Sequence, residues 1–265
     1  MDKKIAIIGG GNLGTAIAEG LINSGFILPE HIIVTKRNIS TLRNLEEKGV
    51  LVTNNNVEAV RFASLVILAV KPFQVEEVLK SVRDTFHESK HLLVSVVTGI
   101  SVEHILRIVG KRLAVARAMP NTAIAIQESM TCISAIHTSE EQMDYVTELF
   151  EQLGRVVVIE EKLMNAATVL GACGTAFAMR YIRANIQGGI EIGFDAATAS
   201  LIAAQTVKGA AQLLLLKGSH PEQEIDKVTT PQGCTIAGLN EMEHQGFSSS
   251  LIKGLVTSYE KIATD

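Results

Sequence analysis

A glycine-rich run near the start of the chain is the first place where residue spacing could do chemistry. Gly9, Gly11 and Gly14 have the spacing Gly-x-Gly-x-x-Gly and follow a short apolar run directly. Between a strand and a helix, such glycines allow a tight turn, close approach of a pyrophosphate, and close packing of the helix. The helix N-terminus then offers N–H groups to the phosphates. We predict a dinucleotide-binding loop here, and the alternative is a glycine-rich turn without a ligand.

A second candidate site follows the next apolar run, where Thr35, Lys36 and Arg37 stand together. An NAD-specific site normally places an acidic residue at this point to bind the ribose 2′-hydroxyl. A hydroxyl and two cations suit a 2′-phosphate instead, and Arg37 can make a planar, charge-assisted contact with it. The segment therefore predicts NADPH as the cofactor, with NADH also possible. The alternative is a solvated Lys-Arg pair in a surface turn.

Two later apolar runs also end in segments that could border a ligand. Lys71-Pro72 follows the run 65–70, and Asn121 lies in the Ala-Met-Pro-Asn-Thr segment 118–122 after the run 113–117. The carboxyl ends of parallel strands border the ligand crevice of an open sheet, so both segments are candidates. Because Pro72 also suits the first position of a helix, a purely structural role is the alternative.

The elements that would position these residues alternate through the first 160 residues. Amphipathic segments such as 13–24, 73–84 and 140–153 separate short β-rich runs. This alternation predicts a Rossmann-type, doubly wound parallel sheet with helices on both faces, an α/β fold. The strands after Met130 are expected to extend its edge. The predicted strands are 4–8, 31–35, 50–53, 65–70, 92–96, 113–117, 130–135 and 155–158.

After Glu160 the strand signals stop, and the sequence reads as helices over 162–187, 196–216, 236–245 and 248–263. We therefore predict a dinucleotide-binding domain over 1–160 and an all-α domain over 161–265. So much apolar helix in about a hundred residues needs a partner surface, which predicts a homo-oligomer through this half. The run 196–216 contains Gln205, Lys208 and Gln212, so we interpret it as a buried helix and not as a membrane span.

Composition and charge exclude several classes of function. The 265 residues carry a formal net charge of -4 with no basic stripe, which argues against a nucleic-acid partner. The three cysteines are widely spaced, and they predict neither a disulfide framework nor a metal site. The first apolar run, 5–8, is too short for a signal peptide, so we expect a cytoplasmic protein without a membrane partner. No acid/base pair or metal cluster stands out, and we expect no metal.

Four segments in this order resemble the pyrroline-5-carboxylate reductase family nearly from end to end. They are Gly-Gly-Gly-Asn-Leu-Gly at 9–14, Ala-Val-Lys-Pro at 69–72, Arg-Ala-Met-Pro-Asn-Thr at 117–122, and the late segment 228–239 with Pro-x-Gly-x-Thr. The resemblance implies NADPH-dependent reduction of 1-pyrroline-5-carboxylate to proline, the last step of proline biosynthesis. It also implies a C-terminal helical domain for dimerisation and substrate binding, and thus a homodimer or higher homo-oligomer.

The resemblance assigns roles residue by residue. The expected cofactor contacts, in addition to the glycines and the segment after the second strand, are Asn12, Leu13, Asn56, Ala69, Val70, Lys71 and Pro72. The expected substrate-binding residues are Asn121, Thr230, Pro231, Gln232, Gly233 and Cys234. Thr235 would be catalytic, with its hydroxyl facing the substrate's ring nitrogen. The alternative for Thr235 is a hydroxyl that satisfies backbone N–H groups at a helix start.

Departures from the family pattern lie near the expected substrate site. Gln232 stands where the family has a glycine, Cys234 replaces a small or hydroxyl residue, and 171–177 reads Gly-Ala-Cys-Gly-Thr-Ala-Phe. They leave two alternatives open: a diverged paralogue that reduces a related cyclic imine, and a cofactor-binding regulatory protein without turnover. A β-hydroxyacid dehydrogenase ranks lower, because Lys162 lies at the start of the first long helix and not in its interior, where such enzymes carry their catalytic lysine.

Overall fold

The computed structural model describes residues 4–264 of the chain. They form two compact units: residues 174–261 make up one unit, and the other described residues make up the second, which contains the sheet. The predicted domain boundary after residue 160 stays a prediction, although residues 161–173 pack with the sheet unit, where Met164, Thr168 and Val169 are buried.

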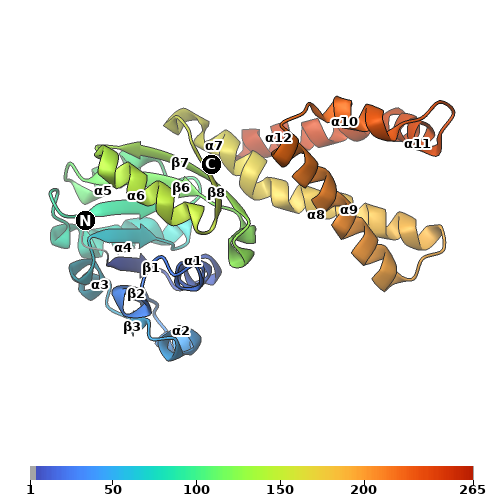
Figure 1. Ribbon diagram of the computed structural model, residues 1–265. Coiled ribbons are helices and arrows are strands. Elements are labelled where there is room, and N and C mark those ends of the chain that lie inside the picture. The colour runs from blue at the N-terminus through green and yellow to red at the C-terminus, as the bar shows by residue number, and fades with distance from the viewer. Residues whose placement is uncertain (1–3, 265) are drawn as a thin grey trace. The chain divides into compact units, whose positions relative to one another are not determined.

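The sheet unit contains an eight-stranded sheet in the order β3-β2-β1-β4-β5-β6-β7-β8, and Figure 1 labels β1, β2, β3, β6, β7 and β8. Each predicted strand is present, with ends shifted by a residue or two. Strands β1 to β6 are parallel, β7 is antiparallel to β6, and β8 is parallel to β7. The strands are Ile5–Ile8, Ile32–Thr35, Leu51–Thr53, Leu65–Leu68, Leu92–Ser95, Ala114–Met119, Ser129–Ile136 and Gly154–Val158.

Helices cover both faces of this sheet, as the alternating pattern predicts. Because side chains alternate along a strand, Ile5 and Ile7 of β1 join one core while Ala6 and Ile8 join the other. Helices α1, α2 and α6 pack on the first core, and α3, α4 and α5 pack on the second. These helices span Asn12–Asn23, Arg43–Glu47, Glu140–Glu151, Asn56–Phe62, Val75–Val82 and Val102–Val109. The fold is therefore doubly wound.

The strand order fixes where a ligand could bind. From β1 the chain winds outward through β2 to β3, and then returns to β4 on the other side of β1. In open α/β sheets, ligands bind at the carboxyl ends of the strands beside such a reversal. The loop after β1 is the glycine run, and the loops after β2 and β4 flank it.

The second unit is helical and contains the helices predicted over 196–216, 236–245 and 248–263, the later part of the one predicted over 162–187, and α10, which was not predicted. Helices α8 to α12 span Gly174–Glu191, Ala196–Lys217, Pro221–Val228, Cys234–His244 and Phe247–Thr264, and the unit ends within α12, at residue 261. The turn between α8 and α9 contains Gly193 at φ 113°, and Asp195 caps α9 by accepting from the N–H groups of Ala197 and Thr198. Close packing of the two helices depends on small residues, since a Cβ on Gly189 would lie 3.1 Å from that of Ala199.

Helix α9 corrects the prediction of a buried helix over 196–216. Within the chain only Ala199 and Ala203 of α9 are buried, whereas Leu201 is 71% and Leu216 is 72% exposed. By length and composition alone, α9 is also the one helix among the described residues that could cross a membrane. The prediction was wrong because the described helices of its own unit leave the outer face of α9 exposed.

Candidate active site

The glycine loop joins β1 to α1, and two of the three glycines of its Gly-x-Gly-x-x-Gly motif have no room for a side chain. Gly9 has φ 114°, and a Cβ there would lie 2.5 Å from the carbonyl oxygen of Ala69. A Cβ on Gly14 would lie 2.1 Å from the Gly9 oxygen, so the helix packs against the loop without space for a side chain. At Gly11 nothing lies within 4 Å of the added Cβ. Backbone atoms thus pack closely against Gly9 and Gly14, whereas the space beside Gly11 is open.

The end of β2 supports this loop directly. The carbonyl oxygen of Thr35 accepts hydrogen bonds from the N–H groups of Gly9 at 3.2 Å and Gly10 at 2.7 Å. Thr35 is buried, whereas Arg37 is exposed and forms an ion pair with Glu77 of α4 at 3.8 Å. The backbone therefore holds Thr35 against the glycine loop, and Lys36 and Arg37 follow it directly in the chain.

Two further predicted cofactor segments lie at the same edge of the sheet. Asn56 is the first residue of α3, after β3, and Asn55 caps that helix by accepting from the N–H groups of Val57 and Glu58. Residues 69–72 follow β4, where the Ala69 N–H donates to the Ile8 oxygen at 2.8 Å and Pro72 opens a short 3₁₀ turn. All of the predicted cofactor residues thus lie at the carboxyl ends of four adjacent strands.

The Asn121 side chain connects the segment after β6 to the end of the sheet unit. Its Oδ1 accepts from the N–H of Ala123 at 3.0 Å, and its Nδ2 donates to the carbonyl oxygen of Gly171 at 3.3 Å. Gly171 belongs to a π-helix over Thr168–Cys173, which sequence patterns did not predict. Irregular turns of this type leave backbone groups without regular helical partners and are frequent at functional sites. Asn121 therefore fixes this irregular turn beside the loop after β6.

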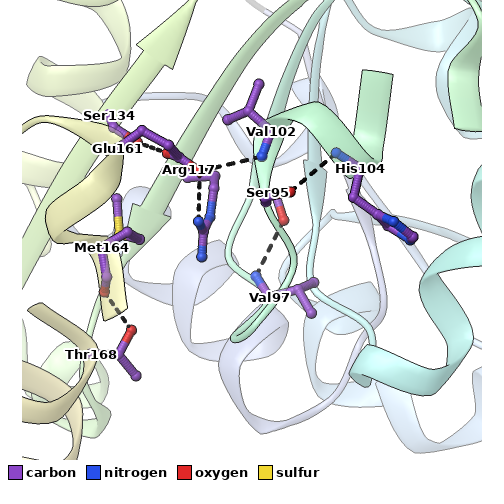
Figure 2. A network of polar contacts seen from close by, with 10 residues as sticks. Ser95, Val97, Val102, His104, Arg117, Ser134, Glu161, Met164 and Thr168 are labelled. Atoms are coloured by element: carbon purple, nitrogen blue, oxygen red, sulfur yellow. Dashed lines mark hydrogen bonds and ion pairs between the residues drawn. The ribbon is translucent and has the colours of Figure 1, made fainter. Parts of the chain in front are cut away.

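An ion pair between a buried arginine and a partly exposed glutamate lies next to this segment, and the sequence patterns did not predict it. Arg117 of β6 is 4% exposed, and its Nη1 contacts Oε1 of Glu161 at 2.7 Å. Figure 2 shows Glu161 between Arg117 and Ser134, with Val102 nearby; the Ser134 hydroxyl and the Val102 N–H both donate to Glu161. Nε and Nη2 of Arg117 are buried without a partner among the described residues. One signal could have indicated the pair, because an arginine inside a strand of small apolar residues requires a buried partner.

The predicted substrate loop lies in the helical unit, between α10 and α11. Thr230 accepts from the N–H of Gly233 at 2.9 Å, with Pro231 and Gln232 at the two central positions of the turn. Gln232 has φ 59°, the left-handed conformation that a type II turn requires at this position and that favours glycine. Cys234 and Thr235 are the first two residues of α11, and Gly233 provides no side-chain cap. The N–H groups of the first turn of α11 are therefore available to a ligand.

Other side chains that could do chemistry are placed more simply. Lys162 is exposed and pairs with Glu160. Cys132, Cys173 and Cys234 are free thiols, and burial raises the pKa of Cys132. Within residues 4–264, no group of three His, Cys, Asp or Glu side chains could hold a metal ion.

The glycine loop fits a dinucleotide pyrophosphate on structural grounds. Gly11 is the N-cap of α1 without a side-chain cap, and the space above it is open. Backbone N–H groups at a helix start are suited to phosphate oxygens, and a side chain at Gly11 would fill the space that they need.

Fold and loop together define a Rossmann-type dinucleotide-binding protein with a helical unit. Residues 4–99 match the family described as NADP oxidoreductase coenzyme F420-dependent, and residues 161–264 match pyrroline-5-carboxylate reductase dimerisation. The chain belongs to the pyrroline-5-carboxylate reductase family, because relatives of that name match nearly all of it at 48% and 43% identity.

Full-length relatives support this assignment. The chain is 48% identical to pyrroline-5-carboxylate reductase 1 of Dictyostelium discoideum over 99% of its own length, but it spans only 50% of that relative. It is 43% identical to pyrroline-5-carboxylate reductase 2 of the same organism, covering 98% of this chain and 92% of the relative. A solved pyrroline-5-carboxylate reductase from Coxiella burnetii superposes with a TM-score of 0.93 at 29% identity, covering 100% and 98% of the two chains.

Proposed function

We propose that this chain is an NADPH-dependent reductase that converts 1-pyrroline-5-carboxylate to proline, the last step of proline biosynthesis. The observation that carries the proposal is the open, uncapped glycine loop at the reversal of strand order. It lies in a chain that belongs to the pyrroline-5-carboxylate reductase family over nearly its whole length.

The residues at the carboxyl edge of the sheet bind and orient the cofactor. NADPH supplies the hydride that reduces the C=N carbon of the substrate. Gly9, Gly11 and Gly14 admit its pyrophosphate, and Asn12 and Leu13 contact it at the start of α1. Thr35, Lys36 and Arg37 bind the 2′-phosphate, and this accounts for the preference over NADH. The remaining contacts come from Asn56 and from Ala69, Val70, Lys71 and Pro72.

The loop between α10 and α11 binds the substrate. The uncapped N–H groups at the start of α11 hold the substrate carboxylate, since a helix N-terminus is a ready anion site. The Thr235 hydroxyl forms a hydrogen bond with the ring nitrogen. An imine that is already protonated needs no separate acid from the protein, and positioning contributes most of the catalysis. The other substrate contacts come from Thr230, Pro231, Gln232, Gly233, Cys234 and Asn121.

The direct test is the oxidation of NADPH, and separately of NADH, on addition of 1-pyrroline-5-carboxylate to the purified protein. Rapid oxidation, faster with NADPH, is expected. Tight NADPH binding without oxidation would contradict the proposal and favour a regulatory protein. If the protein turned over a different cyclic imine but not 1-pyrroline-5-carboxylate, it would instead be a diverged paralogue. The left-handed Gln232 in the substrate loop, where the family has glycine, is the feature that favours this alternative.

Substitution of Thr235 tests its role separately. Thr235→Val removes the hydroxyl at nearly constant size, and we expect kcat to fall about tenfold or more through loss of one hydrogen bond to the reacting ring. Thr235→Ser keeps the hydroxyl and should retain most of the activity. Undiminished turnover in Thr235→Val would refute the role.

We also propose that the helical unit forms the interface of a homodimer or higher homo-oligomer, in a cytoplasmic protein with free cysteines. The support is an apolar cavity of about 500 Å³ between α8 and α9, lined in part by Ile192, Phe194, Ile202 and Val207. Large exposed apolar patches mark interaction sites, and a second copy would cover this one.

A further inference from the structure

Two side chains beside the glycine loop have no role in the cofactor contacts given above. Phe73, the second residue of the 3₁₀ turn after Pro72, is 84% exposed. Glu77, in the first turn of α4, forms an ion pair with Arg37 at 3.8 Å. Both belong to the chain segment that follows β4.

The strand order gives these two side chains a common place. In the sheet, β2 and β4 lie on either side of β1, so the segments after them flank the glycine loop. Arg37 comes from the segment after β2, and Glu77 from the segment after β4. Their ion pair therefore connects the two flanks between which the adenosine half of a dinucleotide would lie.

Phe73 lies on the same segment as Glu77, four residues earlier. It is the second residue of the 3₁₀ turn Pro72–Gln74, which leads directly into α4. An exposed aromatic ring and a guanidinium group on two segments that flank a dinucleotide loop suit a nucleobase, because every base can stack on such planar surfaces. Arg37 also suits a phosphate through bidentate, charge-assisted hydrogen bonds.

We propose that Arg37, Phe73 and Glu77 form the adenosine end of the cofactor site, an inference that rests on the proposed use of NADPH. Phe73 is the surface on which adenine stacks. Glu77 is the counter-ion that Arg37 gives up when it binds the 2′-phosphate. Because NADH has no 2′-phosphate, the Arg37–Glu77 pair persists when NADH binds. Glu77 therefore weakens the binding of NADPH but not that of NADH, and so reduces the difference in affinity between the two cofactors.

The exposure of the Arg37 and Glu77 side chains limits the effect of Glu77 on NADPH affinity. The Arg37 and Glu77 side chains are 80% and 75% exposed. An exposed pair changes an equilibrium constant by about fivefold at most, and salt screens it. Phosphate is the stronger partner for Arg37, so the exchange is favourable and the contribution of Glu77 is modest.

The dissociation constants of NADPH and NADH for Glu77→Gln test the exchange, measured through the fluorescence of the reduced nicotinamide. We expect NADPH to bind about two- to fivefold more tightly than to wild type, NADH to bind equally, and the difference to disappear in high salt. Glu76→Gln is the matched control, because it removes the same charge from the same helix, whereas Glu76 pairs with Lys80 and not with Arg37. Unchanged NADPH binding in Glu77→Gln, or an equal gain in Glu76→Gln, would overturn the exchange.

Phe73→Ala tests the stacking surface. We expect both cofactors to bind about fivefold or more weakly, because both carry adenine, while Phe73→Tyr keeps wild-type affinity. The thermal midpoint should stay constant, since the ring is exposed. Wild-type affinity in Phe73→Ala would overturn the stacking role. If the wild-type chain binds neither cofactor, the proposed function fails and this subsite fails with it; if wild type binds and the variants change nothing, the subsite alone fails.

Discussion

Gly11 and Gly14 stand three residues apart in one loop, but different neighbours constrain them. A Cβ on Gly14 would meet a backbone oxygen at 2.1 Å, and backbone cannot move as a flexible side chain can. A Cβ on Gly11 would meet nothing within 4 Å, and its φ of -84° is open to any residue. The fold therefore requires Gly14, whereas we propose that the cofactor requires Gly11.

This difference predicts separate outcomes for two alanine substitutions. Gly14→Ala should lower the free energy of unfolding by about 2 kcal/mol or more, because the loop and helix must separate. Gly11→Ala should leave stability nearly unchanged and weaken NADPH binding, because the methyl group fills the space for the pyrophosphate. Urea unfolding and cofactor titration of both variants measure this. Equal loss of stability in the two would contradict it.

Gln232 has a backbone conformation that is unfavourable for its residue type. Its left-handed φ of 59° lies where a type II turn favours glycine, so the turn is formed against the preference of the residue. The resemblance to the family indicates a glycine at this position, and Gln232 has the backbone conformation that a glycine would favour.

Among the elements, Glu161 fastens the segment after β8 to two strands and a helix. It accepts hydrogen bonds from Arg117 of β6, from Ser134 of β7, and from the N–H of Val102 at the start of α5. Because Arg117 is buried, removal of its only charged partner within the described residues leaves a guanidinium in a low-dielectric site.

We therefore expect Glu161→Gln to destabilise the protein by about 2–4 kcal/mol, somewhat less than a fully buried pair because Glu161 is 39% exposed. The double variant Arg117→Met with Glu161→Gln should recover part of this loss, since no buried charge then remains unpaired. Chemical denaturation of the single and double variants measures the coupling. A double variant that is less stable than the sum of its single changes would contradict this account.

The segment between α4 and β5 contains a buried histidine. The Nδ1 of His91 accepts from the N–H of His87 at 2.9 Å, so its Nε2 carries the proton and donates to the Val60 oxygen at 3.1 Å. Burial, assisted by the charge of Lys90, lowers the pKa of His91 below its ordinary value of 6.5. The folded state therefore holds this ring neutral.

A lowered folded-state pKa fixes the sign of the pH dependence. The unfolded chain takes up the proton first, so the contribution of His91 is complete above about pH 6.5 and is lost as pH falls through the lower folded-state pKa. Thermal midpoints between pH 8 and pH 5 should fall more steeply for wild type than for His91→Gln. His244→Gln, at an exposed position on α11, should keep the wild-type slope. Equal slopes in wild type and His91→Gln would contradict this assignment.

For the whole molecule, we propose that the exposed face of α9 determines the state of assembly. Ile202 is 46% exposed and lines the apolar cavity between α8 and α9, where a second copy would bury it. Ile202→Asp would place a charge in that interface, and we expect subunit association to weaken about a hundredfold or more. Light scattering after size exclusion should show a dimer or larger oligomer for wild type and a smaller species for the variant. Leu28→Asp, on the sheet unit at 57% exposure, should leave the mass unchanged.

What the sequence determined by itself was local in origin. The eight strands, the glycine loop and the long C-terminal helices follow from apolar periodicity and from glycine spacing, which act within a few residues. The short helix Pro221–Val228 was missed because its few apolar residues give a weak period. Tertiary structure alone decided the antiparallel direction of β7 and the pairing of Arg117 with Glu161, 44 residues apart, because these depend on which segments meet in space. It also decided that α9 is exposed, because burial depends on what covers a helix and not on its own composition.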